Sequence, residues 1–225
     1  MLRGCLVLIF LTQFLRPVWA DDAQVFAQKV QKFYETTQDA TMDFYQDTYV
    51  DLLEKEVRKK GDAKFKKPGK FLIRYQGEHG RQYICNGVKL WVFESGDNQV
   101  QTLTLGEDTI PAEALSLLGG LGQLSKEFAV EEVDPKKWDA LKIKDRNALR
   151  WLELTPLKKR STLDWMVMGF DKDSGLAREV FLYTDSGNLS HYAFDNIKLN
   201  VSLSDKDFEY QKGKAKAPSP NNEAM

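Results

Sequence analysis

Hydrophobic residues recur every three to four positions near the start of this chain and every second position further on. After the first twenty residues, apolar side chains recur every three to four positions, at Val25, Phe26, Val30 and Phe33. That spacing places them on one face of a helix. The preceding acids Asp21–Asp22 lie where the helix dipole favours negative charge. The pattern therefore predicts an amphipathic N-terminal helix.

Beyond residue 41 the apolar positions recur every second residue, which is typical of β-strands. The first strand sets Phe44 and Thr48 among polar residues that include Gln46. Asn86–Gly87 is the strongest short hairpin signal. About ten or eleven antiparallel strands in meander order are predicted, as a long pair over 41–67 and as strands over 70–75, 83–85, 90–93, 99–105, 128–133, 149–154, 163–171, 176–184 and 189–199.

A sheet of this size is expected to curl, because long flat sheets are rare and their edges aggregate. Curling around the first helix gives an antiparallel barrel or half-barrel of about ten or eleven strands, a mainly β fold with helices. The one long connection contains a second predicted helix, which Pro111 begins and Gly119 and Gly120 end. Residues 111–118 are expected to form a helical lid over the barrel.

Both ends of the chain differ in composition from the predicted barrel. Residues 1–20 combine a positive start, a short apolar run and a cleavage site at Ala20, as in a secretory signal peptide. A lipid anchor on Cys5 is disfavoured because no apolar region precedes it. Residues 213–225 are polar and typical of a disordered tail. Residues 21–212 are therefore expected to form one exported domain, cleaved near Ala20.

Length and charge narrow the class of protein. Removing residues 1–20 leaves 205 of 225 residues and takes away Arg3 and Arg16, so the net charge changes from −1 to −3. This balance argues against nucleic-acid binding, which needs a concentrated basic face. Cys85 is then the one remaining cysteine, so it cannot form an intramolecular disulfide and is interpreted as a small buried side chain.

Few residue types in the chain could carry chemistry. His79 and His191 are the only histidines and lie far apart, which argues against a catalytic triad or a zinc site. Asp171 and Asp173 begin like a calcium loop, but Leu182 stands where the final glutamate is required, so a hairpin turn is favoured. The chain is therefore predicted to bind rather than catalyse, with no metal and no cofactor.

A run of seven basic residues extends from Lys55 to Lys67 in an alternating strand region. Such a run predicts a solvated strand face on which lysine also discourages edge-to-edge pairing. Docking of an acidic partner is the alternative interpretation.

Large apolar residues occupy both faces of several strands, as in Phe71–Ile73 and Leu90–Phe93. A sheet with one solvated face would show cleaner alternation. The pattern slightly favours a thick filled core under the first helix. The alternative is a cavity in which apolar side chains face a ligand beneath a lid. Periodicity leaves both interpretations open.

The order of several short motifs resembles the LolA family of periplasmic lipoprotein carriers. The shared features are a glycine, a basic residue before proline, a phenylalanine-containing strand, an Asn-Gly turn and Leu-Trp, here Gly61, Lys67–Pro68, Phe71, Asn86–Gly87 and Leu90–Trp91. The later half is similar at Trp151–Pro156, Asp173–Gly175 and Phe194–Ile197. The resemblance covers about residues 21–210.

This resemblance implies an incomplete antiparallel β-barrel of eleven strands with a helical lid over an apolar cavity. Family members take the acyl chains of lipoproteins from an inner-membrane ABC transporter and hand them to an outer-membrane acceptor. A monomeric periplasmic carrier without enzymatic activity is therefore implied. By position, the residues expected to line the acyl-chain cavity are Phe71, Ile73, Trp91 and Phe93.

The lid is carried over from the family in the same way. Its expected residues are Pro111, Leu115, Leu117 and Leu118. Members place an arginine before the strand proline, where it hydrogen-bonds the lid closed. This chain has Lys67 there, which keeps the charge but lacks the planar multi-donor guanidinium. A weaker latch and a lid that is open more often are expected.

Two alternatives to a lipoprotein carrier remain on the same fold. One is a regulatory module that senses a lipid or lipoprotein, and the other is a carrier of a different amphiphile. Acyl chains present the same surface whatever they are attached to, so the sequence does not decide between them.

The latch hypothesis predicts the effect of Lys67→Arg. The guanidinium should hold the lid closed more firmly and raise the hydrogen-exchange protection of amides in residues 111–118. Exchange measured by mass spectrometry on the wild type and the variant tests this, and unchanged protection would count against a latch role.

Overall fold

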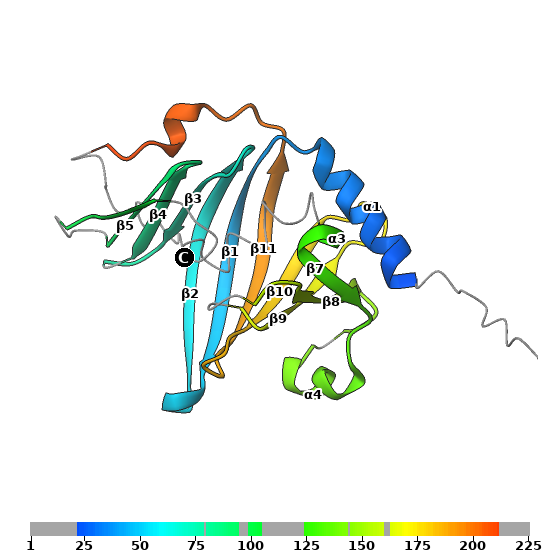
Figure 1. Cartoon of the computed structure of the whole chain (residues 1–225). Helices are drawn as coiled ribbons and strands as arrows, with labels where there is room; N and C mark the ends of the chain where they lie inside the picture. The colour runs from blue at the N-terminus through cyan, green and yellow to red at the C-terminus, as the bar shows by residue number, and fades with distance from the viewer. Residues whose placement is uncertain are drawn as a thin grey trace, which may run out of the picture.

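The computed structural model describes residues 22–78, 80–94, 99–104, 124–143, 145–159 and 163–211. Within them one antiparallel sheet of eleven strands curves round a helix (Figure 1). The strands are β1 (Asp39–Val50), β2 (Lys55–Lys66), β3 (Lys70–Tyr75), β4 (Arg81–Asn86), β5 (Lys89–Glu94), β6 (Gln101–Thr104), β7 (Phe128–Glu131), β8 (Arg150–Pro156), β9 (Trp165–Phe170), β10 (Ala177–Tyr183) and β11 (Leu189–Leu199). The predicted fold class, an incomplete barrel of about eleven strands, is confirmed.

The order of the strands across the sheet differs from a single meander. It runs β6-β5-β4-β3-β2-β1-β11-β10-β9-β8-β7, so that β1 to β6 and β7 to β11 are two meanders. They join at the centre, where β1 pairs with β11 through nine residue pairs. Pairing of the first strand with the last was not predicted. The two edge strands are β6 and β7, which are consecutive in the sequence. They do not pair with each other, so the sheet stays open between them.

Helix α1 (Asp22–Thr36) packs on one face of the sheet, which we call the inner face (Figure 1). Ala23, Ala27, Val30 and Tyr34 are buried, at the three-to-four spacing of one helix face. Val25 points to solvent, although the pattern had placed it on the apolar face. Among the described residues, no helix is long and apolar enough to span a bilayer.

The opposite, outer face is covered by two short segments of the chain. Between β7 and β8, η4 (Pro135–Lys137) and α4 (Trp138–Leu141) pack over the second half of the sheet, around Trp151. After β11, residues 200–211 with η5 (Asp205–Phe208) lie over β3 to β5 (Figure 1). These short elements were not predicted, because three or four residues are too few to show a period.

The segment after β11, residues 200–211, is held by a buried carboxylate and a buried ring. The Asp39 carboxylate accepts hydrogen bonds from the backbone N–H groups of Val201 at 2.6 Å and Leu203 at 3.0 Å. Phe208, with no exposed surface, packs among outer-face residues that include Leu72 and Phe93. The segment is therefore an integral layer of the fold.

Removing the Phe208 ring should destabilise the protein strongly. Phe208→Ala leaves a cavity on the outer face and is expected to lower the free energy of unfolding by about 3–5 kcal/mol. Urea denaturation followed by tryptophan fluorescence measures this. Val201→Ala, at a half-exposed position of the same segment, should change it little. Equal losses in both variants would contradict the role given to the ring.

Candidate functional site

The inner face of the first half of the sheet is lined by apolar side chains. They come from every second residue of β1, β2, β3 and β11, as strand geometry requires. We call them the apolar zone, and its members, all buried, are Met42, Phe44, Phe65, Phe71, Ile73 and Phe194.

Two of the predicted cavity residues belong to the apolar zone. Phe71 lies opposite Phe65 on β2 and Cys85 on β4. Ile73 lies two residues further along the same face, opposite Ala63. The structure therefore places Phe71 and Ile73 on the same face of β3, the inner face. Their contact with acyl chains stays a prediction.

Trp91 and Phe93 lie on the outer face instead. Trp91 is opposite Ile84, whose side chain points away from the apolar zone, and its ring stacks on Tyr210 at 6.4 Å. Phe93 meets the same Tyr210 ring edge-on at 5.3 Å. The prediction that all four residues line one cavity is wrong for these two. Both faces of β5 are apolar because residues 200–211 cover the outer one.

Gly61 allows the Phe44 ring of the apolar zone to pack directly against the backbone of β2. A Cβ atom at this position would lie 2.4 Å from the Phe44 ring and 2.2 Å from the carbonyl oxygen of Arg74. Only glycine therefore fits beneath the ring. Phe44 also meets the Tyr75 ring edge-on, with the ring centroids 5.1 Å apart.

Beyond Phe44, towards the β1–β2 hairpin, the centre of the inner face becomes polar. The side-chain amide of Gln46 donates to Thr48 Oγ1 at 2.8 Å, and Thr48 Oγ1 lies 2.8 Å from Ser190 Oγ. Tyr192 is opposite Gln46 on β11, and its hydroxyl lies 3.5 Å from that of Tyr75. We call Gln46, Thr48, Tyr75, Ser190 and Tyr192 the polar zone.

Sequence reasoning missed the polar zone. Gln46 had been read as part of the polar face of its strand, yet it shares the inner face with Phe44 and Thr48. The signal that could have revealed the polar zone is the position of each residue relative to Phe44 along the strand. Residues two and four positions after a buried phenylalanine are on its face, so polar side chains there mark a change in that surface.

Lys67 follows β2 and contacts the end of α1. Its ammonium group donates to the backbone carbonyl oxygens of Tyr34 and Glu35, the latter at 3.2 Å. Both carbonyls lie in the last turn of α1, where the Tyr34 oxygen also accepts from the Thr37 N–H at 3.2 Å, so the lysine caps the C-terminal end of the helix. Burial lowers the pKa of Lys67, and the nearby charge of Glu35 opposes this. The predicted lid residues Pro111, Leu115, Leu117 and Leu118 lie outside the described residues, and the latch stays a prediction.

The remaining candidate residues have structural surroundings. His191 Nε2 lies 2.8 Å from Glu179 Oε2 on the outer face, and its ring stacks on Phe181. Cys85 is buried, which raises the pKa of its thiol. Hydrogen bonds from Ser174 lower the pKa of the Asp171 carboxyl, as expected for a hairpin turn. His79 lies outside the described residues.

Two lysines of the basic run face acids that belong to the same chain. Lys64 Nζ lies 3.2 Å from Asp207, and Lys66 Nζ lies 2.7 Å from Asp205. An open groove of about 610 Å³ adjoins them on the outer face, with a lining that includes the ion pair of Arg74. This groove is polar and lies on the opposite face from Phe71, so it is not the predicted acyl-chain cavity.

Asp205 should titrate at unusually low pH. Hydrogen bonds from Lys66 and Lys70, at 2.7 and 2.8 Å, lower the pKa of its carboxyl from 3.8 to about 2. Because the folded pKa lies below the unfolded one, the ionised carboxylate stabilises the fold above about pH 4. That contribution is lost as the pH falls from about 4 to about 2.

Asp205→Asn should therefore weaken the acid dependence of stability in this pH window. Urea denaturation at several pH values measures it, and carboxyl NMR gives the pKa directly. Asp139→Asn, which changes an exposed acid beside Arg146, should leave the slope unchanged. Titration of Asp205 at an ordinary carboxyl pKa would refute the prediction.

Together these features define a half-barrel, a single open sheet curved round an apolar inner face with a polar patch at its centre. The chain belongs to the LolA family, because the family model described as outer membrane lipoprotein carrier protein LolA matches residues 35–211.

Named relatives agree with this family. The outer-membrane lipoprotein carrier protein of Nitrosospira multiformis is 24% identical over 150 residues, which are 67% of this chain and 67% of that protein. The one from Ralstonia nicotianae is 25% identical over 150 residues, 67% of this chain and 64% of that protein. The crystal structure of a LolA superfamily protein from Nitrosomonas europaea has a TM-score of 0.45 at 14% identity, covering 84% of this chain and 97% of that one.

Proposed function

We propose that this protein is a periplasmic carrier that shields the acyl chains of lipoproteins on the inner face of its sheet. The observation that supports it most is the apolar zone. In this zone, buried phenylalanines from three separate strands line the inner face of the open, curved sheet, namely Phe44, Phe65 and Phe71. The family to which the chain belongs is described as lipoprotein carriers.

Physical chemistry explains why such a surface suits acyl chains. Each methylene group transferred from water to an apolar site contributes about 0.8 kcal/mol, so a bare acyl chain in water is very unfavourable. A carrier must also release its cargo. A sheet left open between β6 and β7 can change its curvature without breaking a strand pair, which suits reversible binding.

The proposed route runs from an inner-membrane ABC transporter to an outer-membrane acceptor. The signal-peptide composition of residues 1–20 supports export to the periplasm. The protein acts as a monomer and without catalysis, since transfer needs only differences in affinity between successive sites. Its partners are acylated lipoproteins and the two membrane components.

Native mass spectrometry of the full chain purified from the periplasm tests the cargo. A bound diacyl or triacyl lipoprotein, and its release from spheroplasts when the purified protein is added, are the expected results. An empty protein that releases no lipoprotein would overturn the proposal. A bound glycolipid or other amphiphile would support a carrier function but would show that the cargo is not a lipoprotein.

Two alanine variants of β3 separate binding from stability. Phe71→Ala removes a ring from the apolar zone, while Leu72→Ala removes a buried side chain from the outer face of the same strand. Both should lower the free energy of unfolding, but only Phe71→Ala should weaken binding of a dipalmitoyl lipopeptide, by about tenfold or more. Fluorescence titration gives both dissociation constants. Equal affinities for the two variants would contradict an acyl-binding role of the inner face.

A further inference from the structure

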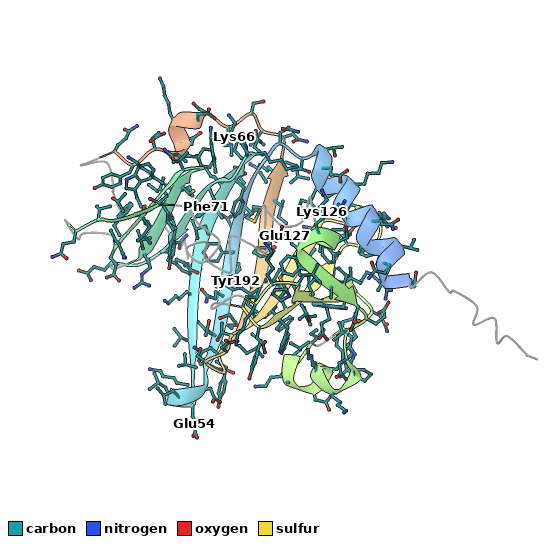
Figure 2. The ribbon with its side chains drawn as sticks, viewed as in Figure 1. Glu54, Lys66, Phe71, Lys126, Glu127 and Tyr192 are labelled. Carbon is teal, nitrogen blue, oxygen red and sulfur yellow. The ribbon has the colours of Figure 1, made fainter. Side chains whose placement is uncertain are left out.

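On the inner face at the centre of the sheet, the polar zone follows the apolar zone, and Lys59 of β2 lies opposite Gln46 with its Nζ 5.5 Å from the centre of the Tyr75 ring. On β1, Phe44 and the next two residues of the same face, Gln46 and Thr48, pair with Phe194, Tyr192 and Ser190 of β11. Figure 2 places Tyr192 between Phe71 and the hairpin tip marked by Glu54. Further out on the same side, β8 to β10 are again apolar, with Leu152, Met168 and Val180 buried. The polar groups therefore form a local patch.

One side-chain atom of this patch has no partner. Gln46 Oε1 is buried, and no described residue forms a hydrogen bond with it. The amide nitrogen of Gln46 donates to Thr48 Oγ1 at 2.8 Å. If the amide is flipped, the hydroxyl can donate to its oxygen instead, and the nitrogen then lacks the partner. One polar atom of Gln46 therefore stays without a hydrogen bond in either orientation of the amide. Leaving a buried polar atom without a hydrogen bond costs stability.

The other unpaired buried side-chain atom among the described residues, Trp151 Nε1, lies in the outer-face cluster under Trp138. The Gln46 amide differs because it adjoins the apolar zone on the face that curves inward. Beside it are the hydroxyls of Thr48 and Ser190, which can each donate or accept, and Tyr192 is the residue opposite Gln46 on β11. Uncompensated polar groups beside an apolar surface are typical of a ligand site, where they fix the ligand's orientation.

We propose that the polar zone binds the ester and amide groups that join acyl chains to the N-terminal cysteine of a lipopeptide. This inference rests on the proposed carrier function and assigns an orientation to its cargo. The acyl chains lie along the apolar zone towards Phe44 and Phe71. The linkage lies at Gln46, and the peptide continues towards the β1–β2 hairpin.

The chemistry of the linkage matches the patch. Ester and amide carbonyl oxygens accept hydrogen bonds, and an amide N–H donates one. The primary amide of Gln46 satisfies either kind, and the hydroxyls around it can adapt to both. A plain hydrocarbon offers no such group and would leave the amide unpaired. The polar zone is therefore a specificity-determining site that distinguishes acylated peptides from other apolar ligands.

The test compares two ligands on the full mature chain. The first is a dipalmitoyl lipopeptide, and the second is N-phenyl-1-naphthylamine, an apolar dye without an ester or an amide. Gln46→Leu keeps the size of the side chain but removes its polar atoms. It should weaken lipopeptide binding three- to tenfold and leave dye binding unchanged. Its thermal midpoint should stay the same or rise, because a buried unpaired atom has been removed.

Tyr192→Phe, which removes only the hydroxyl, should give the same selective loss and serves if Gln46→Leu does not fold. Tyr45→Phe, on the exposed outer side of β1, is the matched control and should affect neither ligand.

If the wild type binds the lipopeptide and Gln46→Leu binds it equally well, the polar zone has no such role and the carrier proposal stands. An equal loss for both ligands would also overturn the inference, because it would mean a general disturbance of the face. If the wild type binds neither ligand, the carrier proposal itself fails.

Discussion

The pairing of β1 with β11 is the interaction on which the rest of the structure depends. It joins two meanders into one sheet and brings residues about 150 positions apart in sequence into register, such as Phe44 with Phe194. Because the sheet is joined at its centre, its two free edges are β6 and β7. A barrel closed through those edges would need them to pair. Central pairing therefore gives a curved sheet that keeps one opening.

The two faces of this sheet are covered differently. The outer face is covered in two places by the chain's own segments, with Phe208 buried on one half and Leu141 on the other. Two of its lysines, Lys64 and Lys66, pair with Asp207 and Asp205 of the segment that follows β11. On the inner face α1 packs on the second half of the sheet, as the edge-on contact of Phe26 with Phe170 of β9 shows. The aromatic residues of the first half lie on the inner face, opposite the outer groove.

The sequence predicted α1, all eleven strands and the Asn86–Gly87 hairpin, because each depends on local periodicity and turn chemistry. It did not predict which face each strand presents. Phe71 and Trp91 look alike in the pattern, and only the position of residues 200–211 decides that Trp91 faces outward. The pairing of β1 with β11 and the burial of Gln46 are likewise tertiary facts. The choice between a filled core and a cavity depends on such facts too, so periodicity could not make it.

Gly61 and Gln46 together mark the boundary between the two zones of the inner face. Without a side chain at residue 61, the Phe44 ring lies directly on the backbone of β2 and ends the apolar zone there. One step further along β1, Gln46 introduces an amide that the described residues satisfy only in part. A sequence selected for stability alone would place an apolar residue at this position, since that removes an unpaired polar atom at no cost in packing. Retaining the amide is consistent with a binding role, because a ligand would supply the missing hydrogen bond.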